Sequence, residues 1–220
     1  MITVKKLKEN IYWLGEFYHF EKVISYLIIW KEKALLFDTG MGIFDMKNEI
    51  EKITSLPISV INSHSHFDHI WWNNLFDEVW IYDNDSMKEI SLNWVSKEII
   101  NVNYIDSKFF NKPDFFNLDS FVISWFRYSK LLKDWDKIDL GLYKLTVVHT
   151  PGHSIDHICL YEENNWYLFS GDLIYNWWIY IENYLDYANS IKKIGNLEIK
   201  FIFPGHNDFI VNNDLIKANI

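Results

Sequence analysis

Histidine and aspartate residues follow four short apolar segments of the chain, each at the point where the segment ends. The apolar segments cover residues 58–61, 143–148, 166–169 and 201–203. The polar residues that follow them are His64, His66, Asp68, His69, His153, Asp172 and His206. Loops held at the ends of a rigid sheet are where functional sites are built, so we expect these side chains to converge at one edge of the fold.

These side chains have the chemistry of a metal site. Neutral imidazole and carboxylate bind zinc and related first-row ions, and a site for one ion uses only three or four such ligands. The larger set found here therefore predicts two ions. His64 and His66 share one loop and can point the same way, whereas Asp68 and His69 diverge from them, so one segment can serve two neighbouring metals. Asp172 can bridge two ions about 3.5–4 Å apart, as two-metal hydrolytic sites require.

The apolar pattern around these residues predicts alternating strands and helices. Further short segments rich in β-branched or aromatic residues lie at 11–14, 23–30, 34–37, 79–82 and 157–161. Two amphipathic helices are expected, with Ile43, Met46, Ile50 and Ile53 on one apolar face and Tyr184, Ala188, Ile191 and Ile194 on the other. We interpret residues 84–135 as mainly helical. No linker or repeat divides the chain, so we expect an α/β layered architecture in a single domain over residues 1–220.

Composition argues against several classes of protein. The 220 residues include 21 basic and 30 acidic ones, for a net charge of −9, so a nucleic-acid-binding surface is not expected. The longest nearly apolar run, residues 23–30, is far shorter than the ~20 residues of a membrane-spanning helix, so no membrane partner is expected. A single cysteine, Cys159, and an N-terminal segment without the pattern of a secretory signal predict a cytoplasmic protein without disulfides.

The order and type of these motifs resemble the metallo-β-lactamase superfamily. The resemblance rests on Asp38-Thr39-Gly40 after a strand, on the HxHxDH segment that ends at His69, and on later PGH, GD and GH segments. It runs from about residue 11 to residue 211. It implies a four-layer αββα sandwich with the site at one edge of two sheets.

The resemblance also implies a role for each ligand. His64, His66 and His153 would hold the first metal, Asp68, His69 and His206 the second, and Asp172 would bridge them. Asp38 would orient a ligand through a hydrogen bond. Zinc is the expected metal, with iron or manganese as alternatives.

The function implied by the resemblance is that of a metal-dependent hydrolase. A metal-bridging hydroxide would cleave an ester, thioester or lactone bond of a small, partly apolar substrate, and Asp68 would orient the nucleophile and carry a proton to the leaving group. Asp172 stands where a cysteine or serine is usual in the β-lactamases themselves, which weakens the resemblance to that branch. A phosphodiesterase, an iron-dependent oxidoreductase of the same fold and a non-catalytic binding protein stay open as alternatives. So do the substrate, the native metal and the oligomeric state.

Two tryptophan pairs lie close to the candidate ligands in sequence: Trp71-Trp72 and Trp177-Trp178. Adjacent residues of a helix diverge by about 100 degrees. We therefore predict that one ring of each pair forms an aromatic wall of the substrate pocket and that the other enters the core. His149 and His157 are interpreted as packing or surface residues, and Cys159 as a buried small apolar residue.

Overall fold

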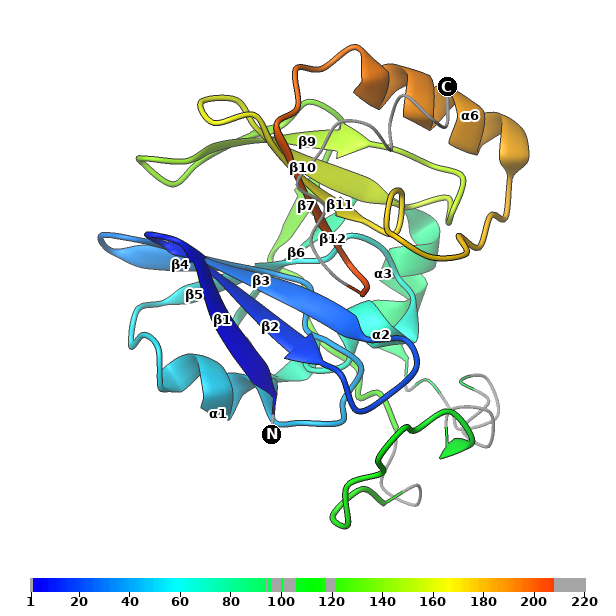
Figure 1. The fold of residues 1–220 in the computed structure, drawn as a ribbon. Coiled ribbons are helices and arrows are strands. Elements are labelled where there is room, and N and C mark those ends of the chain that lie inside the picture. Colours follow the sequence, from blue (N-terminus) through cyan, green and yellow to red (C-terminus); the bar gives the residue numbers. More distant parts are fainter. Residues whose placement is uncertain (1, 94, 96–99, 101–105, 118–121, 208–220) are drawn as a thin grey trace.

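A computed structural model describes residues 2–93, 95, 100, 106–117 and 122–207 (Figure 1). Their strands form two sheets that pack face to face, and helices lie on the outer side of each sheet. None of the helices in these ranges is long and apolar enough to cross a bilayer.

The first sheet has seven strands in sequence order. They are β1 (Thr3–Lys8), β2 (Ile11–Glu16), β3 (Val23–Trp30), β4 (Lys33–Phe37), β5 (Ile58–Ile61), β6 (Glu78–Tyr82) and β7 (Lys130–Leu132). Strands β1 to β4 pair antiparallel, and β4 to β7 pair parallel. The parallel half matters for function, because the loops that follow its strands lie at one edge of the sheet.

The second sheet has five strands in the order β12-β11-β10-β9-β8. They are β8 (Lys137–Asp139), β9 (Lys144–His149), β10 (Ile158–Glu162), β11 (Tyr167–Gly171) and β12 (Phe201–Pro204). All neighbours pair antiparallel except β11 and β12, which are parallel. The segments that follow β11 and β12 therefore lie side by side.

The described helices are short except for the last long one. They are α1 (Met46–Glu51), α2 (Phe67–Ile70), the 3-10 helix η1 (Asn73–Leu75), α3 (Asp85–Leu92) and α6 (Tyr184–Gly195). Asn183 begins α6 because its side chain accepts hydrogen bonds from the backbone nitrogens of Leu185 and Asp186. The buried face of α6 carries Tyr187, Ile191 and Ile194, and Tyr184 is exposed instead of joining that face as expected.

Three apolar layers hold the four structural layers together. Between the sheets, Phe37 and Ile61 of the first sheet pack with Phe169 and Phe203 of the second. A second cluster joins the first sheet to α1, α2 and α3, and a third joins the second sheet to α6. Figure 1 shows α1 and α6 on opposite outer sides of the molecule. The predicted αββα sandwich is confirmed.

Sequence and structure differ in the stretch between residues 84 and 135. Helix α3 covers Asp85–Leu92, but residues 107–117 and 122–129 form turns, bends and isolated bridges, and β7 follows. The prediction of a mainly helical region is therefore wrong for these residues. Apolar residues recur there without a helical period because they pack from irregular chain onto the first apolar cluster: Phe109 and Phe116 pack against each other and against that cluster.

Candidate metal centre

The seven predicted ligands come together at one edge of the two sheets. The segments that carry them follow β5, β9, β11 and β12, and α2 lies within the first of these segments. Six of the seven residues are buried, and His66 is half-buried. The convergence predicted from the ends of the strands is thus present in the structure.

The first group of donors consists of His64, His66 and His153. The Nε2 atom of His153 lies 3.1 Å from Nε2 of His64 and 3.0 Å from Nδ1 of His66. Three imidazole nitrogens therefore point at a common centre. This is the geometry of a site for a cation that accepts nitrogen ligands.

The second group consists of Asp68, His69 and His206. The Oδ2 atom of Asp68 lies 3.6 Å from Nε2 of His69 and 3.5 Å from Nε2 of His206. One carboxylate oxygen and two imidazole nitrogens again face a single point.

Asp172 lies between the two groups. Its Oδ2 is 3.4 Å from Nε2 of His153, in the first group, and 3.0 Å from Nε2 of His206, in the second. Its Oδ1 is 3.3 Å from Nε2 of His69. A carboxylate in this position can contact two ions at once.

Three of the histidine rings are each held by a hydrogen bond at Nδ1, the nitrogen that points away from the centre. This bond determines that Nε2 is the nitrogen whose lone pair faces the centre. Nδ1 of His153 lies 2.8 Å from the carbonyl oxygen of Tyr180, and Nδ1 of His206 lies 2.7 Å from the carbonyl oxygen of Glu21. A carbonyl oxygen only accepts, so each Nδ1 carries a hydrogen, and in the neutral form of the ring Nε2 holds the lone pair that faces the centre. His69 has the same arrangement, with Nδ1 2.9 Å from Oδ2 of Asp38. This pattern is typical of histidines that bind metals.

Two buried polar atoms at the centre make no hydrogen bond to the described residues. They are Nε2 of His69 and Oδ1 of Asp172, which lie 3.3 Å from each other without the geometry of a hydrogen bond. Leaving a buried polar group unpaired costs about 1–3 kcal/mol, and more for a charged group. A divalent cation would satisfy both atoms at once, so the residues present fit a metal.

Asp38 orients His69 of the second group through the ring nitrogen that points away from the centre. Its carboxylate accepts hydrogen bonds from the backbone nitrogen and the Oγ of Ser63, at 2.6 and 2.8 Å, as well as from His69. Asp38 also has a φ of 65°, in the left-handed region that few residues other than glycine occupy. Strained backbone of this kind clusters at functional sites, because the surrounding structure must enforce it.

Burial and charge affect the two groups of histidines differently. The pKa of His64 is held well below its usual value because the ring is buried and because His69, His66 and His153 surround it. Burial also lowers the pKa of His69 and His206, but the carboxylates of Asp172 and Asp68 outweigh burial and raise both values, that of His206 to about 9. The same attraction holds the pKa of Asp172 well below its usual value despite burial. The second group therefore combines with its carboxylates into a region that attracts cations.

His157 supports the centre, although its place in the sequence predicts a packing or surface residue. The ring is fully buried, and its Nε2 accepts a hydrogen bond of 3.0 Å from the backbone nitrogen of Asp172. Its Nδ1 lies 2.8 Å from Oγ1 of Thr150. A histidine at the start of an otherwise apolar strand was the available signal. By contrast, His149 lies outside the cluster and stacks on Tyr82, and Cys159 is buried as expected.

Glu16 is a second buried polar residue near the centre that the motifs do not include. It ends strand β2, and its two carboxylate oxygens accept hydrogen bonds from the backbone nitrogens of Met41, Ile43 and Phe44. This holds the loop that follows Asp38. A lone carboxylate at the end of an apolar strand was the signal that could have identified it.

Two glycines allow the backbone to come close to the ligands. A Cβ atom at Gly205 would lie 2.7 Å from Oδ1 of Asp172 and 3.0 Å from Cε1 of His69. Gly171 has a φ of 48°, and a Cβ there would lie 2.8 Å from Nε2 of His157. Any other residue at either position would displace ligands or their supports.

The two tryptophan pairs do not form one wall over the ligands. Trp71 is buried in the apolar cluster beneath the first sheet, and Trp72 packs against the same cluster. Trp177 and Trp178 are both exposed, so neither enters the core as predicted for one member of each pair. The ring of Trp177 lies 6.0 Å from that of Phe20. Phe20 precedes Glu21, whose carbonyl oxygen accepts the hydrogen bond from His206 of the second group.

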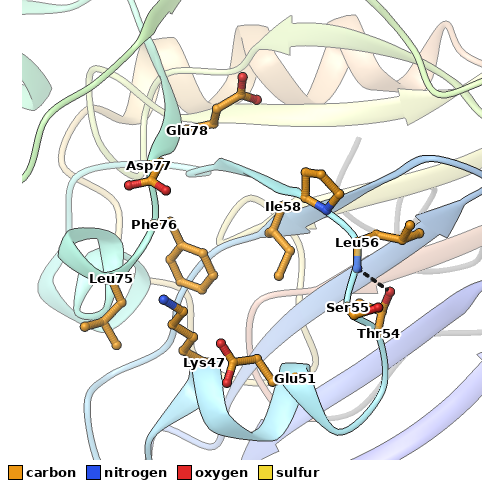
Figure 2. Close-up of a pocket in the computed structure, with 11 residues that line it drawn as sticks. Lys47, Glu51, Thr54, Ser55, Leu56, Ile58, Leu75, Phe76, Asp77 and Glu78 are labelled. Atoms are coloured by element: carbon orange, nitrogen blue, oxygen red, sulfur yellow. Dashed lines mark hydrogen bonds between the residues drawn. The ribbon is translucent and has the colours of Figure 1, made fainter.

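A cavity of about 570 Å³ lies at the opposite end of the first sheet (Figure 2). It is bordered by Glu51 of α1, by Ile58 at the start of β5 and by Glu78 at the start of β6. The candidate ligands follow the ends of strands, so this cavity and the metal centre are at different ends of the sheet. None of the residues described as lining it belongs to the donor groups.

Similarity to known proteins points to the same family throughout the chain. The family model described as the metallo-beta-lactamase superfamily matches residues 21–206. The acyl-coenzyme A thioesterase MBLAC2 of Gallus gallus is 26% identical, over 92% of this chain and 79% of its own. The protein of the same name from Homo sapiens is also 26% identical, over 98% of this chain and 88% of its own.

Solved structures support the fold. A metallo-beta-lactamase family protein from Thermus thermophilus superposes with a TM-score of 0.70 at 18% identity, covering 97% of this chain and 79% of that chain. VMB-1 superposes with a TM-score of 0.69 at 17% identity, covering 99% of this chain and 94% of that chain.

Proposed function

Because the chain belongs to the metallo-beta-lactamase superfamily and is a hydrolase, we propose that it hydrolyses thioesters with the help of two divalent metal ions. The observation that carries the two-ion part is the position of Asp172, whose oxygens face both donor groups within 3.0–3.4 Å. The thioester part rests on the relatives, which are named as acyl-coenzyme A thioesterases.

The proposal assigns every donor to a metal. His64, His66 and His153 would hold one ion, Asp68, His69 and His206 would hold the other, and Asp172 would touch both. Zinc suits this mixture of imidazole and carboxylate, and iron or manganese would also fit it. Bound there, divalent ions would make water a nucleophile near neutral pH and would polarise the carbonyl oxygen of the substrate.

The chain's own residues would hold the proton that the reaction moves. Oδ2 of Asp68 faces His69 and His206, which leaves Oδ1 to take the proton released when water attacks the thioester carbon. The carbon–sulfur bond then breaks, and Oδ1 returns the proton to the departing thiolate. The products are a carboxylic acid and a thiol, so atoms and charge balance.

The rim of the centre offers further groups to a substrate. Tyr180 is exposed, and its ring lies 6.5 Å from that of His66 and 5.9 Å from that of His153. Oε1 of Glu182 lies 3.8 Å from Nε2 of His66. The ring of Tyr175 lies 5.2 Å from that of His206. In this proposal a bound substrate would contact these residues, whereas Trp71 is buried in the core.

The test is a panel of substrates with one metal-loaded preparation. Release of thiol from acyl thioesters would be compared with hydrolysis of a p-nitrophenyl ester and of bis-p-nitrophenyl phosphate, before and after chelation. We expect the thioester to give the highest kcat/KM, loss of activity on chelation and recovery when zinc is returned. Preferred hydrolysis of the phosphodiester, or thioester hydrolysis that survives removal of all metal, would contradict the proposal.

A further inference from the structure

A second, smaller cavity adjoins the metal centre through His66. Its volume is about 190 Å³, and Ser65, His66, Phe67, Ile70, Ile90 and Ile123 are among the described residues that line it. The described lining residues are apolar apart from Ser65 and His66. Phe67 and Ile70 belong to α2, and Ile90 belongs to α3, so the cavity lies between the helix that carries two ligands and the helix beside it.

The volume of this cavity is that of a small apolar group. An apolar cavity of about 150 Å³ stays dry and takes up benzene, a molecule of six carbon atoms. The cavity beside His66 is somewhat larger and has side chains of the same type. It therefore suits an apolar group of about six carbon atoms.

His66 connects the cavity to the reaction centre. His66 is one of the residues that line the cavity, and its Nδ1 lies 3.0 Å from Nε2 of His153, in the first donor group. The cavity is therefore one residue away from the first donor group, and an apolar group attached to a carbonyl at the centre can reach it past His66.

The polarity of the wall decides which half of a thioester enters. Among the described lining residues none is an Asp, Glu, Lys or Arg, so this part of the wall suits the apolar half of a coenzyme A thioester better than its polar, charged half. An alkyl chain gains about 0.8 kcal/mol for each CH₂ group that it buries. We propose that this cavity binds the acyl chain of the substrate, with room for about six carbon atoms, an inference that rests on the proposed thioesterase function.

The first test is a series of thioesters that share one thiol and differ in acyl length from two to twelve carbons. We expect kcat/KM to rise up to about fourfold for each added CH₂, the factor that corresponds to ~0.8 kcal/mol, and to stop rising near six carbons. Values of kcat/KM that do not depend on length would overturn the acyl assignment but leave the proposed thioesterase function intact. If no thioester of any length were hydrolysed, both would be overturned.

Variants of the residues that line the cavity test whether the acyl chain binds there. Ile90→Trp should fill part of the cavity and lower the ratio of kcat/KM for hexanoyl to that for acetyl thioester by about tenfold or more. Leu92→Trp is the matched control, because Leu92 lies on the same helix, is 72% exposed and is not among the lining residues. That variant should keep the wild-type ratio.

A variant that enlarges the cavity covers the case in which Ile90→Trp does not fold. Ile123 is buried at the wall, so Ile123→Ala should move the optimal acyl length to longer chains by one or two carbons. An unchanged optimum in Ile123→Ala, at wild-type metal content, would overturn the proposed location.

Discussion

Nε2 of His157 accepts a hydrogen bond from the backbone nitrogen of Asp172 at 3.0 Å, and this fixes the segment that carries the carboxylate between the two donor groups. His157 itself is held from the other side by Thr150, through its Nδ1. It thus positions Asp172 without belonging to either donor group.

We predict that His157→Ala weakens metal binding. Loss of a residue that orients ligands typically lowers metal affinity or activity by about 10–100-fold. Competition with a chelator would measure affinity, and activity at saturating zinc should recover part of the loss. His149→Ala is the control, since His149 stacks on Tyr82 outside the cluster and should bind metal like wild type. Equal affinity in His157→Ala and wild type would remove the positioning role.

Asp38→Asn should weaken the second site more than the first. Asparagine tolerates the left-handed backbone at this position, so the change removes charge with little added strain. His69 then loses its carboxylate partner, and we expect about 10–100-fold weaker binding of one of two ions. Stepwise zinc titration would resolve the two affinities. A variant in which both affinities match wild type would show that Asp38 does not orient His69 for metal binding.

Glu16 should make the protein less stable as pH rises. Burial raises its pKa to about 7 from 4.5, although hydrogen bonds from Met41, Phe44 and Ile43 oppose the shift. Between these values the folded protein holds a proton that the unfolded chain releases. The stabilisation that comes from the proton on Glu16 is therefore fully present below pH 4.5 and is lost as pH rises through 7. It amounts to about 3 kcal/mol of unfolding free energy.

Urea unfolding of wild type and Glu16→Gln at pH 5 and pH 8 measures this effect, because the titration of every other group is common to both. Relative to the variant, wild type should lose about 2.5 kcal/mol of unfolding free energy between the two pH values, because part of the full effect is already lost at pH 5. The same pH dependence in both proteins would show that Glu16 is ionised across the whole range.

Trp71 and Trp178 should differ in how much they contribute to the free energy of unfolding. Trp71 is 4% exposed within the core, whereas Trp178 is 86% exposed. Trp71→Ala should lower the unfolding free energy by about 3–5 kcal/mol, and Trp178→Ala should change it by less than about 0.5 kcal/mol. Thermal and urea unfolding would compare them. Similar stability losses in both variants would contradict the packing described for these rings.

Most of the centre could be predicted because each ligand stands next to a short, strongly apolar strand. A histidine or aspartate at such a position has few roles other than a site, and the order of the motifs resembles one superfamily. The geometry places Asp172 between the groups, as the sequence suggested. Its supports, His157 and Glu16, were not identified, because their importance depends on hydrogen bonds to residues 15 and 25 or more positions away.

The fold was predictable where strands are buried and less so at the edges. Strand β3 is buried over most of its length and reads as a continuous apolar run. Edge strand β1 is largely exposed and rich in lysine, so it lacks the apolar pattern of a buried strand. Strands β7 and β8 are three residues each, which is too short to show the alternation of apolar and polar residues typical of a strand. Residues 107–117 and 122–129 form turns, bends and isolated bridges, which an irregular apolar pattern cannot distinguish from helix.

The number of metal ions per chain tests the central claim most directly. Elemental analysis after equilibration at a fixed, saturating concentration of free zinc should give two ions per chain for the wild-type protein. Asp172→Ala, which removes the carboxylate shared by both groups, should retain one ion or fewer under the same conditions. A wild-type protein that holds only one ion at saturation, or an Asp172→Ala variant that still holds two with wild-type activity, would contradict the account.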